Sequence, residues 1–165
     1  MRPAATLRRP GGGAFALIAL LAFGAVGVAL YTQHRLDMQP CPWCVLQRLV
    51  FVAIGAWALV AALLPARPVR IVSTVAVSLL AGCGIAAALW QHFVAAASAS
   101  CNLTFADRVM NATGLNECFP EVFAAYASCA DAAVSLAGIP YEFYSLALFV
   151  LIDGLAILAL VRGRR

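Results

Sequence analysis

Charged side chains are scarce in this chain of 165 residues. Only 11% of its residues are charged, lysine is absent, and 64% of its residues are hydrophobic. Such a composition excludes an ordinary water-soluble domain. The net charge of +4 comes without a basic patch interleaved with aromatic residues, so nothing in the sequence indicates nucleic-acid binding. The composition instead predicts a membrane protein.

Four long apolar runs are present, each close to the roughly 20 residues that a helix needs to cross a bilayer. They cover residues 14–31, 45–64, 71–90 and 144–161. Only the segment between the last two runs, residues 91–143, is long enough to form substantial structure outside the membrane. We therefore expect an all-α membrane protein with a single domain over residues 1–165. It would be a four-transmembrane-helix bundle with one long periplasmic loop.

The arginines are distributed unevenly around the four runs. Eight of the eleven fall on one side of a four-helix topology: Arg2, Arg8, Arg9, Arg67, Arg70, Arg162, Arg164 and Arg165. Only Arg35, Arg48 and Arg108 fall on the other side. Because arginine-rich flanks stay in the cytoplasm, we predict that both termini are cytoplasmic.

Five of the six cysteines then lie on the outer side of the membrane: Cys41, Cys44, Cys101, Cys118 and Cys129. In a bacterium this side is the oxidising periplasm, so these cysteines are expected to form disulfides. A four-thiolate zinc site would use more regular spacing, and the sequence has no second C-x-x-C motif. We predict no metal site. Cys83, inside the third run between two glycines, is expected to be an inert small residue at a helix contact.

The motif Cys-Pro-Trp-Cys at residues 41–44 opens the second apolar run. Its proline suits the first helical position, which puts Cys41 near the helix cap and Cys44 in the first turn. Free backbone N–H groups there favour a thiolate. Arg48 shares a helix face with Cys44, and Gln47 adds a neutral donor on nearly the same face. The motif predicts a redox pair, although a structural disulfide with Arg48 reaching the membrane interface is the alternative.

The long loop carries a second group of cysteines: Cys101, Cys118 and Cys129. Spacing alone allows any two of them to pair. A disulfide in an exposed loop can exchange with the thiol of another protein if its sulfur is open to in-line attack. It can also simply hold the loop together. Two cysteine pairs on the same side of the membrane favour an electron relay.

These features together resemble the disulfide bond formation protein B (DsbB) family, the quinone reductases of the bacterial inner membrane. The resemblance rests on Pro-Cys-Pro-Trp-Cys-Val-Leu-Gln-Arg at residues 40–48, on the loop cysteines, and on Gly-Ile-Pro at residues 138–140. It implies that a reduced periplasmic thiol oxidase, DsbA-like, attacks a loop disulfide between Cys101 and Cys129, with Cys101 forming the mixed disulfide. The freed Cys129 would attack Cys41. Cys44 would then be released as a thiolate that passes electrons to a membrane quinone.

The same resemblance suggests the quinone site. The quinone would be ubiquinone or menaquinone, and Arg48 would orient it, with Gln47 beside it. His92 falls where the family often has a polar residue close to the quinone. The sequence departs from the family at Val134, where many members have tryptophan, and Cys118 is an additional cysteine.

We therefore expect an enzyme, a protein dithiol:quinone oxidoreductase that supports disulfide formation in exported proteins. One alternative is a four-helix membrane scaffold with structural disulfides. Another is a vitamin K epoxide reductase-like quinone reductase, although that family's C-x-x-C motif lies late in the chain. A carrier that brings reducing power outward would need cysteines on the inner side, where this chain has none.

Overall fold

The computed structural model of the chain describes residues 12–64, 66–97 and 104–162. Four helices are long and apolar enough to cross a membrane, so the predicted all-α, four-helix fold is confirmed. They are α1 (Gly12–Leu36), α2 (Pro42–Leu63), α3 (Arg67–Trp90) and α7 (Tyr141–Arg162). A short π-helix, η1 (Gln91–Ala95), continues α3.

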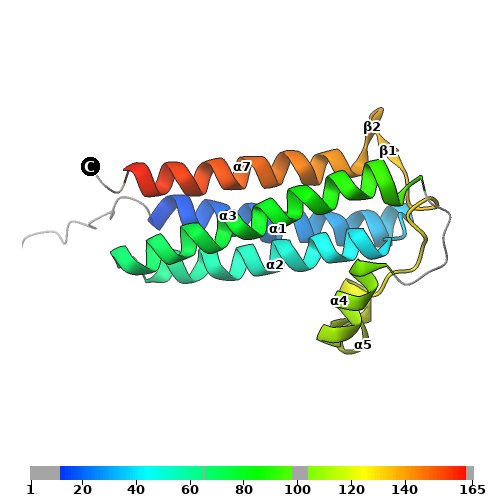
Figure 1. Cartoon of the computed structure of the whole chain (residues 1–165), viewed down its shortest axis with the longest axis horizontal. Helices are drawn as coiled ribbons and strands as arrows, with labels where there is room; N and C mark the ends of the chain where they lie inside the picture. The colour runs from blue at the N-terminus through cyan, green and yellow to red at the C-terminus, as the bar shows by residue number, and fades with distance from the viewer. Residues whose placement is uncertain (1–11, 65, 98–103, 163–165) are drawn as a thin grey trace, which may run out of the picture.

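The four long helices form a closed ring in which α1 packs against α2, α2 against α3, α3 against α7, and α7 against α1. They run alternately up and down, so the beginning of α1 and the end of α7 lie at one end of the bundle (Figure 1). There Arg70 Nη2 donates a hydrogen bond of 2.9 Å to the carbonyl of Ala159, which joins the start of α3 to the end of α7. The connection between α1 and α2 and the long loop between α3 and α7 extend from the opposite end.

Aromatic rings pack against glycines at contacts between the long helices. The rings of Phe51 and Phe149 stack with centroids 4.0 Å apart and an angle of 5° between their planes. Phe149 also lies against Gly84 of α3, as Phe23 of α1 lies against Gly55 of α2. Small residues at such contacts are typical of helices that pack in lipid, where close van der Waals contact replaces the hydrophobic driving force.

The outer surface of the long helices is rich in exposed leucine, valine and isoleucine, as a lipid-facing surface requires. Cys83 lies on this surface: it is an exposed free thiol of α3. Its predicted place at a helix contact is therefore wrong. The small-residue contact in this part of α3 is made by Gly84, one position further along the helix.

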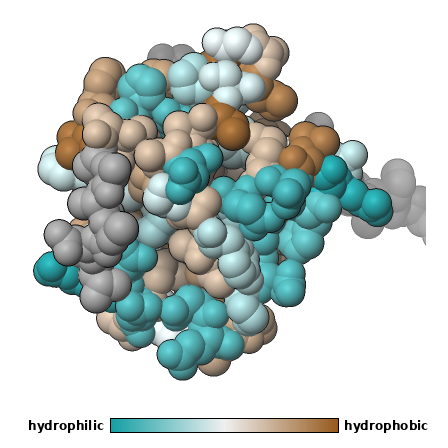
Figure 2. All heavy atoms as spheres, turned by 90° about the vertical axis from the view of Figure 1, so that its right-hand side faces the viewer, coloured by the Kyte–Doolittle hydropathy of each residue, from teal (hydrophilic) through white to brown (hydrophobic). Residues whose placement is uncertain are grey.

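The part of the long loop that the structure describes after η1 contains three short helices and a hairpin. The helices are α4 (Phe105–Thr113), α5 (Leu115–Cys118) and α6 (Pro120–Phe123), and the hairpin pairs β1 (Ser135–Leu136) with β2 (Ile139–Pro140) in antiparallel register. A capping box of Thr104 and Asp107 begins α4, and Gly114, with a φ of 66°, ends it. At this end of the bundle, hydrophilic and apolar side chains are interspersed (Figure 2).

Two contacts fasten the loop over the start of α2. Phe123 of α6 packs in a buried cluster with Val45 of α2 and Met110 of α4. The backbone N–H groups of Tyr126 and Ala127 both donate to the carbonyl of Pro40, at 3.0 and 3.3 Å. The residues that follow Ala127 are thereby held beside the Cys-Pro-Trp-Cys motif.

Candidate functional site

Cys41 is the N-cap of α2, and its sulfur accepts a hydrogen bond of 3.3 Å from the backbone N–H of Cys44. The motif's proline occupies the first turn, as its position in the sequence predicted. This local geometry brings the sulfurs of Cys41 and Cys44 to 2.9 Å, with both cysteines free. The pair is therefore placed to form and break a disulfide with little movement of the backbone.

A third sulfur joins this pair from the loop. Cys129 is buried, and its side chain is hydrogen-bonded to that of Cys41; the backbone N–H of Trp43 also donates to it. The hydrogen bond from the Cys41 thiol lowers the pKa of Cys129 below its ordinary value. The pKa of Cys41 is raised, because its thiol is hydrogen-bonded to Cys129 and Cys44 and is buried. Cys129 is thus the sulfur of the two that more readily carries the negative charge.

The remaining loop cysteines lie apart from this cluster or outside the structure's range. Cys118, at the C-terminal end of α5, is an exposed free thiol. Cys101 lies outside the described residues, so its predicted pairing with Cys129 stays a prediction.

An apolar cavity of about 390 Å³ opens beside Cys44, walled mainly by α1, α2 and α7. Its apolar wall is made by Leu20, Leu21, Gly24, Ala25, Val28, Ala29, Phe51, Leu136 and Leu148. The polar residues that line it include Cys44, Gln47 and Arg48 of α2, together with Gln91 and Glu142. The arrangement suits a flat, mostly apolar ligand with polar groups at one end.

Two glutamines link the cavity wall to the reactive sulfur. Gln47 Nε2 donates a hydrogen bond of 2.7 Å to Gln91 Oε1, and Gln91 Nε2 donates one of 3.3 Å to Cys44 Sγ. Both glutamines are buried. Gln47 therefore acts on Cys44 through Gln91, a residue that the sequence interpretation missed. The only available signal was that Gln91 is the first polar residue after the third apolar run.

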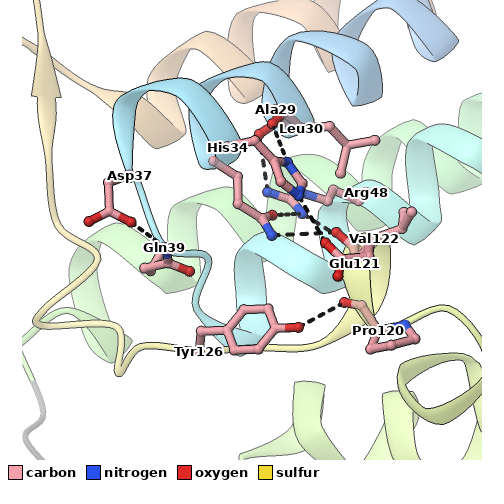
Figure 3. Close-up of polar contacts among 11 residues, drawn as sticks. Ala29, Leu30, His34, Asp37, Gln39, Arg48, Pro120, Glu121, Val122 and Tyr126 are labelled. Atoms are coloured by element: carbon pink, nitrogen blue, oxygen red, sulfur yellow. Dashed lines mark hydrogen bonds and ion pairs between the residues drawn. The ribbon is translucent and has the colours of Figure 1, made fainter.

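Arg48 is buried in the bundle and only 5% exposed, whereas the alternative interpretation requires an arginine whose charged end reaches water. Its Nη1 donates to Gln33 Oε1 at 2.7 Å and to the carbonyl of Val122 at 3.1 Å, and its Nη2 donates to the carbonyl of Ala29 at 3.3 Å. Figure 3 shows the guanidinium group between α1 and the loop segment that carries Val122.

None of these acceptors carries a charge, and among the residues that the structure describes no carboxylate lies within ion-pair distance of Arg48. A buried cation without a counter-ion is costly, so such a site favours any anion that forms nearby. Arg48 and Cys44 line the same cavity. A thiolate on Cys44 or a negatively charged ligand would fill this role.

His92 does not line the cavity itself. It lies on η1, and its Nδ1 is 2.6 Å from Oε1 of Glu142, which does line the cavity. The predicted contact between His92 and a quinone therefore stays a prediction, with Glu142 in the nearer position. The sequence interpretation missed Glu142, although an acidic residue at the start of the last apolar run was a usable signal.

Val134, where the family often has tryptophan, is likewise absent from the cavity wall. Its carbonyl accepts a hydrogen bond of 3.0 Å from the N–H of Tyr141, which fixes the hairpin against the start of α7. Leu136 of the hairpin and Tyr141 line this side of the cavity.

Comparison with known proteins gives a consistent set of relatives. The family model described as "Disulfide bond formation protein DsbB" matches residues 11–160. A disulfide bond formation protein B from Ralstonia nicotianae is 35% identical over 159 residues, which cover 92% of this chain and 94% of that protein. One from Cupriavidus necator is 37% identical, over 87% of this chain and 89% of that protein.

Proposed function

Because the chain belongs to the disulfide bond formation protein DsbB family, we propose that it is a protein dithiol:quinone oxidoreductase. Membership makes it an oxidoreductase of disulfide bond formation, and its four long helices make it a multi-pass membrane protein. The proposed reaction reoxidises a DsbA-like periplasmic thiol oxidase and delivers the electrons to ubiquinone or menaquinone.

One observation carries this proposal: Cys44 belongs to two sites at once. Its sulfur lies 2.9 Å from that of Cys41, which is itself hydrogen-bonded to Cys129. Cys44 also forms part of the wall of the apolar cavity. A sulfur in this position can receive electrons from a protein thiol and pass them to a lipid-soluble acceptor. A structural disulfide needs no such cavity.

On the thiol side, the partner's thiolate attacks the Cys101–Cys129 disulfide at Cys101 and releases Cys129. The Cys129 thiolate attacks Cys41, so a Cys129–Cys41 bond forms as the Cys41–Cys44 bond breaks and Cys44 leaves as a thiolate. The backbone N–H of Trp43, which donates to Cys129, stabilises the attacking thiolate. The hydrogen bond from Gln91 and the nearby charge of Arg48 stabilise the negative charge on Cys44.

The cycle closes when the partner's second thiol attacks the mixed disulfide and releases Cys101. Cys101 re-forms its bond with Cys129, and the freed Cys41 re-forms its bond with Cys44 as two electrons leave through Cys44. Overall, the partner's dithiol loses two electrons and two protons.

The cavity residues fit a quinone. The volume of about 390 Å³ is within the range of small-ligand sites, and the wall is mostly apolar. A bound quinone would supply the chemistry of accepting two electrons and two protons. Arg48 and Gln91 would hold its carbonyl oxygens, because both line the cavity near Cys44 and Gln91 Nε2 is directed toward the sulfur of Cys44. His92 does not line the cavity, so it would influence the quinone through its contact with Glu142.

We also propose that the protein lies in the bacterial inner membrane with both termini in the cytoplasm. The uneven distribution of arginines supports this orientation. The motif cysteines then face the periplasm, because they lie at the opposite end of the bundle from the start of α1 and the end of α7.

The test uses the purified full-length protein in nanodiscs, with a reduced DsbA-like oxidase as donor and a ubiquinone analogue whose absorbance reports its reduction. Wild-type protein should reduce the analogue, and Cys44→Ser should abolish this reaction. The matched control is Cys83→Ser, which removes an exposed thiol of α3 far from the motif and should leave turnover unchanged. If Cys44→Ser reduced the ubiquinone analogue as fast as the wild type, the proposal would be wrong and the scaffold alternative would be favoured.

A further inference from the structure

The carboxyl group of Glu142 and the imidazole of His92 form a hydrogen-bonded connection between the cavity and the outside of the bundle. Glu142 is 7% exposed and lines the cavity together with Cys44. Its Oε1 lies 2.6 Å from Nδ1 of His92, whose side chain is 31% exposed. His92 lies on η1, at the end of the bundle that carries the loop. A group that can hold a proton thus faces the cavity, and a second one connects it to the surface.

The proposed reaction creates a need for such a connection. Electrons reach the cavity through sulfur, but the protons of the partner's dithiol are released at the protein surface. Reduction of a quinone consumes two protons inside an apolar cavity. A buried acid with a partner at the surface is a device that can supply them.

The other groups that face the cavity are poor proton donors. Arg48 does not give up its proton in proteins. Tyr141 shares a hydrogen bond of 3.2 Å with Thr32 Oγ1, and the hydroxyl of Tyr144 donates to the carbonyl of Leu136 at 2.7 Å. Cys44 is occupied with the transfer of electrons.

The described part of α1 contributes no titratable side chain to the cavity wall, and α2 contributes only Cys44 and Arg48. Glu142 therefore remains as the proton donor of this site. His92 is the group in contact with it that can return a proton to its carboxylate.

We propose that Glu142 and His92 form a two-residue proton relay that delivers protons from the aqueous side to the acceptor bound beside Cys44. The relay rests on the proposed quinone reduction and assigns its proton path. In each pass Glu142 gives the proton of its carboxyl group to the acceptor. It then takes a proton from Nδ1 of His92, and the imidazole is reloaded from water. Two passes balance the two electrons that leave through Cys44.

The test compares Glu142→Gln with wild-type protein under quinone-reduction conditions. The amide keeps the size and a hydrogen-bond acceptor but cannot carry the proton. We expect kcat to fall on the order of 10²-fold, as for the loss of a general acid, with little change in the KM for the quinone analogue. Glu142→Asp keeps the carboxyl group and should restore part of the rate. His92→Ala should become slow, and added imidazole should restore its rate in a concentration-dependent way.

The chain contains its own matched control, a second histidine–glutamate pair. His34 and Glu121 are 2.9 Å apart, but both are well exposed and neither lines the cavity. Glu121→Gln and His34→Gln should therefore keep the wild-type kcat and the wild-type dependence of kcat on pH. Glu142→Gln should flatten that dependence.

A readout independent of turnover is the infrared difference spectrum between the dithiol and disulfide forms of the quinone-loaded protein. A carboxyl C=O band should change in the wild type and in Glu121→Gln, and should be missing in Glu142→Gln. A Glu142→Gln variant with wild-type kcat, pH profile and carboxyl band would overturn the relay and leave the quinone reductase proposal intact. A wild-type protein that reduces no quinone would overturn both.

Discussion

At the scale of single residues, the hydrogen bond between Cys41 and Cys129 determines which of these two sulfurs carries negative charge more readily in the reduced protein. Its donor is the Cys41 thiol, so it favours the charged form of Cys129 and lowers the pKa of that thiol. The pKa of Cys41 is raised for the corresponding reason. In the reduced protein, negative charge therefore lies more readily on Cys129 than on Cys41.

This asymmetry gives a prediction about pH. In the reduced protein, the rate of alkylation of Cys129 by iodoacetamide should stay high to a lower pH than that of free cysteine added to the same sample, because only the thiolate reacts. In Cys41→Ala the hydrogen bond is lost, the pKa of Cys129 rises, and its alkylation profile should move to higher pH. Mass spectrometry of the labelled peptides and of the labelled free cysteine measures both rates in one sample.

The matched variant is Cys41→Ser, whose hydroxyl can still donate to Cys129. Its profile should lie between those of the wild type and Cys41→Ala. Identical profiles in all three proteins would mean that Cys41 does not control the charge on Cys129.

The sequence predicted the parts of this site that a single segment carries. The phase of one helix was enough to place Arg48 and Cys44 on the same wall, and the C-x-x-C spacing with its proline was enough to place Cys41 at the helix cap. Gln91 and Glu142 could not be found in this way. They come from η1 and α7, and they meet α2 only after the bundle has formed.

At the scale of the elements, hydropathy predicted the number and order of the long helices, but it misplaced their ends. The last apolar run begins at residue 144, whereas α7 begins at Tyr141; the start of α2 at Pro42 is the one that the proline of the motif predicted. The difference at α7 lies in Glu142, a polar residue that is helical and lines the cavity. A scan for apolar residues ends at the first polar one, and here that polar residue belongs to the site.

Helix packing gives a prediction about stability. A Cβ atom added at Gly84 would lie 2.4 Å from the ring of Phe149, which is fully buried and stacked on Phe51. Gly84→Ala should therefore lower the free energy of unfolding by about 1–3 kcal/mol, as expected for overpacking in a tight core. Unfolding of the purified protein in detergent measures the change.

Gly82 provides the control on the same helix. A Cβ atom at that position meets nothing within 4 Å, so Gly82→Ala should keep or slightly raise stability, because alanine favours the helical conformation. Equal stability of the two variants would show that α3 and α7 have room to separate at Gly84.

At the scale of the whole molecule, the loop is suited to water and the outer surface of the helix ring is suited to lipid. The loop end carries the sulfurs and hydrophilic side chains, whereas the cavity is walled by helices whose outer surfaces are apolar. The proposed thiol oxidase, from water, and the proposed quinone, from the membrane, would then reach the same cysteine pair from different directions. The separation of these routes predicts that blocking one should spare the other.

Gly24 of α1 allows this separation to be tested. It lines the cavity, and a Cβ atom built on it meets nothing within 4 Å, so a larger side chain there should extend into the cavity without disturbing the helix contacts. Gly24→Leu should raise the KM for a ubiquinone analogue by roughly 10-fold, since a few methylene groups then compete for the same space.

The rate at which a reduced DsbA-like oxidase exchanges with the loop cysteines should be unchanged in Gly24→Leu, because the loop lies at the end of the bundle. Gly27→Leu is the matched control: Gly27 lies on the same helix with open space around it, but it does not line the cavity. Steady-state kinetics with varied quinone and stopped-flow exchange with the oxidase separate the two routes. If Gly24→Leu slowed the exchange as much as quinone reduction, or if Gly27→Leu raised the KM equally, the acceptor would not occupy this cavity.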